Sequence, residues 1–288
     1  MTLELASLAG ICLLILVANL EQRRRDELES SGLSAAPESI VGRFWRLVSA
    51  LCKGLDLGRR ARFEPSNMVH RTAALLMIGY ALLTLAMLSQ SEESSRLSVI
   101  STETFDGMLR LVITSAAYLV AALLGVGWLT RRRFAAVLQR LDLKLPNRRD
   151  WLEGLALACA LFVLAQTGVA LWADLAPPAL FDIQTHAARH IFESLNASWL
   201  AGMLFALTAA LSEEILFRGA LQPIFGIVIS SLLFALLHTQ YLLTPAALIL
   251  LVVSLGFGWL RTRRNTSAAI ICHAAYNALP FLMHRLAV

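Results

Sequence analysis

The sequence has little charge. Only 16% of its 288 residues are Asp, Glu, Lys or Arg, 57% are hydrophobic, and the mean hydropathy is +0.65. A soluble domain carries about a quarter charged residues, so this composition excludes an ordinary soluble protein and favours a multi-pass membrane protein. The net charge of +5 does not indicate a nucleic-acid partner, because the arginines gather in short blocks beside apolar runs, as they do in cytoplasmic loops.

The sequence also has few lysines and no closely spaced cysteines. Lys53 and Lys144 are the only lysines, a bias that we attribute to a GC-rich bacterial genome, so the bacterial inner (plasma) membrane is the expected location. The cysteines show no CxxC spacing, which makes disulfides and zinc knuckles unexpected. They should instead pack as small apolar side chains. They are Cys12, Cys52, Cys159 and Cys272.

Long apolar runs predict about eight membrane-spanning helices, since a span takes about 20 apolar residues. The expected fold class is therefore all-α, a polytopic bundle of transmembrane helices. The first run has no basic stretch before it and Arg23 to Arg25 after it, so we expect a retained anchor with its N-terminus outside. The candidate spans are 3–20, 72–88, 111–129, 152–172, 199–217, 224–240, 245–260 and 267–283.

Loop charges orient this bundle. Residues 21–71 contain ten arginines and lysines, and segments 130–150 and 261–264 are also basic. The loop 89–107 is acidic, and 173–198 is only weakly charged. The positive-inside rule therefore places the basic segments in the cytoplasm and both termini outside.

Residues 21–71 also contain a predicted amphipathic helix. After a linker, apolar residues recur at helical spacing from Ile40 to Leu55, with basic residues among them. This pattern is typical of an interfacial helix on the cytoplasmic surface of the lipid bilayer, and packing on the bundle is the alternative. The expected division of the chain is an N-terminal anchor (1–20), a cytoplasmic linker and amphipathic helix (21–71), accessory helices and loops (72–198) and a membrane core (199–288).

Two adjacent carboxylates, Glu213 and Glu214, end one apolar run. Such groups are expensive in a bilayer unless they are paired or functional. Arg218 follows Glu214 by four residues, so the two share a helix face and can form an ion pair. Glu213 points about 100° away and can face another helix. The plain alternative is a solvated helix end at the membrane interface.

Two later runs each carry a histidine. Phe234 and His238 are four residues apart, so the phenyl ring can pack beside the imidazole, and His273 and Asn277 share a helix face in the same way. Each pair alone is also explained by helix packing. Together with Glu213 they predict hydrolysis, because a carboxylate can take a proton from water, an imidazole can position that water, and a His–Asn pair can bind an oxyanion.

The combined motifs resemble the CPBP family of intramembrane proteases, also called the Abi or CAAX-protease family. The resemblance covers residues 213–277, about a quarter of the chain, and implies an endopeptidase acting on a membrane-associated protein or peptide. The residues that carry it are Glu213-Glu214-x-x-x-Arg218-Gly219, Phe234-x-x-x-His238 and His273-x-x-x-Asn277.

The resemblance also implies a role for each residue. Glu213 would be the general base that activates water, and His238 would hold that water. His273 and Asn277 would form the oxyanion site. The supporting residues would be Glu214, Arg218 and Phe234.

No metal or other cofactor is expected. Glu213, His238 and His273 could form a three-ligand zinc site, but the chain has no HExxH motif. The family is generally regarded as using glutamate without an obligatory metal.

A second histidine pair lies in the segment 173–198. His186 and His190 are one helical turn apart, with Asp182 and Glu193 on nearby turns. An external zinc site is one interpretation, and a solvated amphipathic helix is the one that we favour.

The depth of His238 raises a difficulty. His238 follows Pro223 by fifteen residues, which is too deep to meet Glu213 if the helix begins at that proline. The difficulty disappears if the helix begins near Gly226, or if the preceding helix continues past Gly219. In either case we expect the site in a cavity open toward the cytoplasmic half.

Two other functions remain open. A non-catalytic immunity or scaffold protein of the same fold would keep the polar cluster for helix packing. A proton-coupled transporter would use the buried Glu and His residues as a relay, although no inverted repeat is found. Neither the substrate nor the oligomeric state follows from the sequence.

Overall fold

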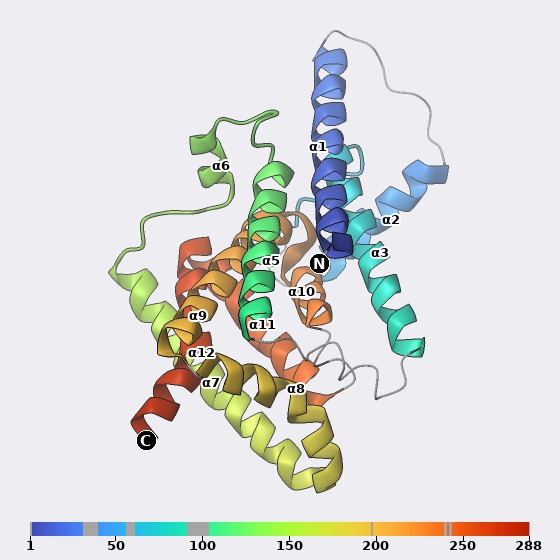
Figure 1. The fold of residues 1–288 in the computed structure, drawn as a ribbon. Helices are drawn as coiled ribbons and strands as arrows, with labels where there is room; N and C mark the ends of the chain where they lie inside the picture. The colour runs from blue at the N-terminus through green and yellow to red at the C-terminus, as the bar shows by residue number, and fades with distance from the viewer. Residues whose placement is uncertain are drawn as a thin grey trace.

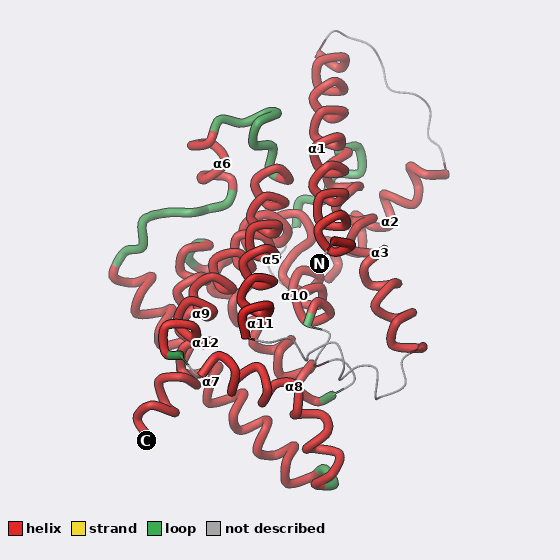
Figure 2. The backbone as a smooth tube through the Cα atoms, in the orientation of Figure 1, coloured by secondary structure: helices red, strands yellow, loops and turns green. Residues whose placement is uncertain are grey.

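The protein is built of helices. The computed structural model describes residues 2–30, 40–55, 61–90, 104–196, 198–238, 241 and 244–287, and no strand occurs in these ranges. The predicted all-α class is therefore confirmed, and Figure 2 shows the helices with their connecting loops.

The helices follow the predicted apolar runs closely. Each of the runs lies in or largely overlaps a helix, and the longer helices of the C-terminal half pack side by side (Figure 1). In chain order they are α1 (Thr2–Ser30), α2 (Ile40–Leu55), α3 (Met68–Gln90), α5 (Thr104–Gly125), α6 (Phe134–Arg140), α7 (Arg148–Leu175), α8 (Pro178–Asn196), α9 (Trp199–Glu214), the π-helix η1 (Ile215–Leu221), α10 (Gln222–Leu237), α11 (Pro245–Arg263) and α12 (Thr266–Ala287).

Four helices of the described part are long and apolar enough to cross a membrane. They are Arg148–Leu175, Trp199–Leu237, Pro245–Arg263 and Thr266–Leu286. Met68–Leu82 and Leu111–Gly125 are shorter apolar helices. The chain is thus an integral membrane protein, and the count of eight spans stays a prediction.

One of these helical runs folds back on itself. Helices α9, η1 and α10 are continuous in sequence, yet the rings of Phe217 and Phe234 lie 5.2 Å apart. A straight helix would separate these residues by roughly 25 Å. The chain reverses at Gly226, whose φ of 83° and ψ of 172° are non-helical. The preceding helix therefore continues past Gly219 and the next arm begins after Gly226, which removes the difficulty over the depth of His238.

The predicted amphipathic helix forms as α2. Its Trp45 and Cys52 are buried against Phe63 and Phe225, so one face packs on the bundle, as the alternative interpretation expected. Its other face leaves apolar side chains exposed, and contact of that face with the bilayer stays a prediction. The exposed residues are Phe44, Leu47, Leu51 and Leu55.

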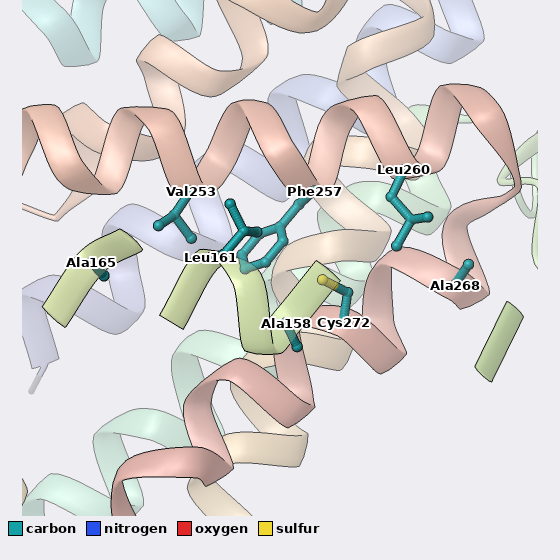
Figure 3. Close-up of a cluster of buried hydrophobic side chains, with 8 residues drawn as sticks. All are labelled: Ala158, Leu161, Ala165, Val253, Phe257, Leu260, Ala268 and Cys272. Atoms are coloured by element: carbon teal, nitrogen blue, oxygen red, sulfur yellow. The ribbon is translucent and has the colours of Figure 1, made fainter. Parts of the chain in front are cut away.

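The main core joins three long helices. Figure 3 shows the cluster, in which Cys272 of α12 and Phe257 of α11 lie beside Ala158 and Leu161 of α7. The buried positions of Cys52 and Cys272 agree with the expected apolar packing, whereas Cys159 is exposed, and all four cysteines are free. The full set is Ala158, Leu161, Ala165, Val253, Phe257, Leu260, Ala268 and Cys272.

We expect Gly226→Ala to destabilise the protein. The backbone of Gly226 lies in a region that is open essentially to glycine alone, so a side chain there should lower the free energy of unfolding by about 1–3 kcal/mol. Gly79→Ala is the matched control, because a Cβ at Gly79 meets nothing within 4 Å. Thermal unfolding of the purified variants in detergent compares the two, and equal stability of both variants contradicts the reversal.

Candidate active site

An ion pair without exposed surface lies at the centre of the site. Arg218 Nε donates to Glu214 Oε2 at 3.1 Å, and both side chains are 0% exposed. Arg218 Nη2 also donates to Ser254 Oγ at 2.8 Å, and Nη1 to Ser231 Oγ at 3.4 Å. A buried charge is tolerated only when it is paired and hydrogen-bonded, and these partners come from three segments: α9, α10 and α11.

Arg218 stands within the π-helix η1. The backbone N–H of Gln222 bonds to the carbonyl of Phe217, five residues back, a helical form that is rare and frequently marks functional sites. Gly219 allows the neighbouring segment to approach closely, because a Cβ there would lie 3.0 Å from Leu141 Cδ2 and 3.3 Å from its carbonyl oxygen. Close packing against Leu141 therefore explains why the motif has a glycine at position 219.

His273 faces both glutamates. Its Nδ1 lies 2.9 Å from Glu214 Oε1, and its Nε2 lies 4.0 Å from Glu213 Oε2. A carboxylate accepts hydrogen bonds, so Nδ1–H is the donor and Nε2 is directed to Glu213. The ring of Phe257 stacks on the imidazole, with centroids 4.6 Å apart and planes 22° apart. The orientation of His273 is thus fixed by one hydrogen bond and one stacked ring.

His238 is also oriented by a local bond. Its Nδ1 lies 2.8 Å from the carbonyl oxygen of Phe234, so Nδ1–H donates and the other ring nitrogen of the neutral form is an acceptor. The rings of the two residues are 4.6 Å apart, which confirms the packing that their spacing predicted. Phe234 also lies under the guanidinium of Arg218, at 5.4 Å, and therefore joins both halves of the site.

The four residues with expected catalytic roles line one cavity of about 880 Å³. Glu213 is 18% exposed there, whereas Glu214 and Arg218 lie behind the cavity wall. The lining residues recur every three or four positions along each helix, so each wall of the cavity is one face of a helix. The faces include Phe162, Gln166, Val169 and Trp172 of α7, Phe205, Ala209 and Glu213 of α9, Ile249, Val253 and Phe257 of α11, and His273, Asn277, Pro280 and Phe281 of α12.

The direction of the cavity differs from the expected one. No residue of the basic segments 130–150 and 261–264 lines it. The walls instead extend from Glu213 toward the helix ends that meet the weakly charged segment 173–198. Under the predicted topology this is the outer side, not the cytoplasmic half toward which we expected the cavity to open; the orientation of the bundle in the membrane stays a prediction.

Helix α8 explains the amphipathic pattern around the second histidine pair. One face of α8 lines the cavity, including Phe181 and Arg189, whereas His186 is exposed and does not line it. The side chain of His190 lies outside the described residues. Among the side chains that are described, no group of three or more His, Cys, Asp or Glu residues is placed to hold a metal ion.

Three functional contacts were not expected from the sequence. Ser231 and Ser254 hold Arg218, and Phe257 orients His273. The signal for the two serines was available, because isolated hydroxyls in apolar helices commonly bond to neighbouring helices. Phe257 gives no such signal, since an aromatic residue in an apolar run is ordinary packing material.

We expect Arg218→Leu to be strongly destabilising. It leaves the carboxylate of Glu214 buried without its cation, so the free energy of unfolding should fall by about 3–5 kcal/mol. Arg263→Leu is the control, since it breaks an exposed pair with Glu153 that contributes at most about 1 kcal/mol. Unfolding measured in detergent should separate the two variants, and similar losses in both contradict the central place of the pair.

Comparison with known proteins gives one match. A family model described as type II CAAX prenyl endopeptidase, Rce1-like, matches residues 194–279. No curated protein and no solved structure matches the chain. The matched segment contains all the motif residues from Glu213 to Asn277. Residues 194–279 thus match the Rce1-like CAAX-protease family, the CPBP group that the motifs indicated.

Proposed function

We propose that this protein is an intramembrane endopeptidase, a multi-pass enzyme of a bacterial inner membrane. Its substrate would be a membrane-associated protein or peptide. The observation that carries the proposal is the single cavity lined by Glu213, His238, His273 and Asn277, with the paired Glu214 behind it. The family match of residues 194–279 supports protease chemistry.

Glu213 is the group that activates water in this proposal. Its Oε2 lies 4.0 Å from His273 Nε2, which is too long for a direct hydrogen bond, so this carboxylate oxygen is free to accept a hydrogen bond from a water. Since Nδ1–H of His238 is already used on the carbonyl of Phe234, its other nitrogen can accept a hydrogen bond from that water. The water would then be held for attack.

His273 is placed between the protein and the substrate. The guanidinium of Arg218 offsets the charge of Glu214, and Glu214 accepts the hydrogen bond from Nδ1–H of His273. In this proposal the imidazole reacts in its doubly protonated form, so that Nε2–H is available to the substrate.

The reaction follows from this arrangement. Glu213 takes a proton from the water as the oxygen bonds to the carbonyl carbon of the substrate, and the carbonyl oxygen gains negative charge. Nε2–H of His273 and the side-chain amide of Asn277 donate hydrogen bonds to that oxygen. The C–N bond then breaks, and the proton on Glu213 passes to the leaving amine. Every proton transfer is assigned to a side chain, so the proposal includes no metal or cofactor.

We expect Glu213→Gln to abolish cleavage in a protein that still folds, since the amide cannot take the proton. The measurement compares peptide termini in membrane and secreted fractions of wild-type and variant cells by mass spectrometry. Glu153→Gln, which alters an exposed ion pair, is the control. Termini that vanish only in Glu213→Gln identify the substrate and the cut. If no termini differ although both variants accumulate, the protein is a non-catalytic scaffold.

Asn277→Ala should lower kcat by about 10²–10³-fold. The loss arises in the transition state, where the amide binds the developing oxyanion, so KM should change much less. In the described part of the chain the Asn277 side chain makes no hydrogen bond, which predicts a small effect on stability. Steady-state kinetics on the substrate identified with Glu213→Gln measures kcat and KM separately. A change confined to KM contradicts the oxyanion role.

A further inference from the structure

The outer end of the cavity is formed by α8. The side chains that line it recur every three or four residues, so they form one face of the helix. The family match begins at residue 194, and this face lies before it. Figure 1 shows α8 between the end of α7 and the start of α9. The lining residues are Phe181, Gln184, Thr185, Arg189, Phe192 and Glu193.

This helix is fixed to the bundle by aromatic contacts at both ends. Trp172 of α7 meets Phe181 edge-on, with ring centroids 5.0 Å apart. Phe192 stacks on Phe281 of α12, at 5.2 Å and an interplanar angle of 17°. The face of α8 therefore keeps a defined position relative to the catalytic end of the cavity.

The outer end carries an uncompensated negative charge. Arg189 is the only arginine or lysine among the described residues that line the cavity, and it is already paired with Asp182 at 2.9 Å. Glu193 lines the cavity, is exposed, and has no ion pair within the described part of the chain. The three groups sum to one negative charge, so this end is complementary to a cation.

The length of the cavity walls sets the distance between the catalytic end of the cavity and the end formed by α8. Along α12 the lining face runs from His273 to Met283, ten residues or roughly 15 Å of helix. A peptide in extended conformation covers that length with about four to five residues. The walls between these ends are mainly apolar, with Phe162 and Val169 on either side of Gln166 on α7 and Ile249 on α11, and they suit apolar side chains.

We propose that Glu193 binds a basic side chain of the substrate, which makes it a specificity-determining residue. This inference rests on the proposed protease function. The substrate is a polypeptide in which about four to five mainly apolar residues separate the cleaved bond from a lysine or arginine. The apolar residues lie along α7, α11 and α12, and the basic residue lies at α8.

A charge-reversal experiment tests this inference. The full chain is reconstituted in liposomes and given a peptide library with an apolar stretch and one variable position, Lys or Glu, on either side of it. Cleavage is followed by mass spectrometry. Wild type should prefer the Lys peptides in kcat/KM by about fivefold to tenfold, and Glu193→Lys should prefer the Glu peptides. Both peptides are tested on the same enzyme preparation. A lower folded fraction therefore lowers both cleavage rates equally and leaves the ratio of the two kcat/KM values unchanged.

Asp174→Lys is the matched control. Asp174 is an exposed acid near the end of α7 that does not line the cavity, so its reversal changes the net charge equally and should leave the ratio as in wild type. An unchanged ratio in Glu193→Lys, or an equal shift in Asp174→Lys, overturns the role of Glu193. Failure of wild type to cleave any peptide overturns the protease proposal itself.

Discussion

The ion pair between Arg218 and Glu214 is the interaction on which the rest of the site depends. Both side chains lie in apolar helices without exposed surface, where an unpaired charge would be strongly destabilising. The π-helix presents the guanidinium to Ser231 and Ser254, and the second oxygen of Glu214 binds His273. Arg218 is thus linked through Glu214 to the imidazole that faces Glu213, and the pair orders groups on four helical segments.

The local part of this site could be predicted from the sequence. Residues four apart share a helix face, so the contact of Glu214 with Arg218 and the packing of Phe234 beside His238 followed from spacing alone. The contacts between distant segments did not follow. No local pattern states that Phe257 lies on His273, or that Ser254 reaches Arg218. Those pairings depend on which helix faces meet, and spacing along one helix does not show this.

The same distinction holds for the whole fold. Apolar length predicted the helices well, because a membrane span needs a long hydrophobic run. Loop charges oriented those spans, yet they did not indicate where the cavity between them would open. The cavity extends away from the basic segments and is lined at its end by α8, whose amphipathic pattern had suggested a solvated helix or a zinc site. Periodicity shows that a helix has two faces, but it does not show what covers the polar one.

The central claim is that water, activated by Glu213, attacks the peptide bond directly. A single-turnover reaction in water labelled with heavy oxygen tests it, with enzyme in excess over the substrate. The account predicts that the label enters the new carboxyl terminus of the product and does not enter the enzyme peptide that contains Glu213. Label in the Glu213 side chain would show that this carboxylate attacks the substrate itself and would contradict the account.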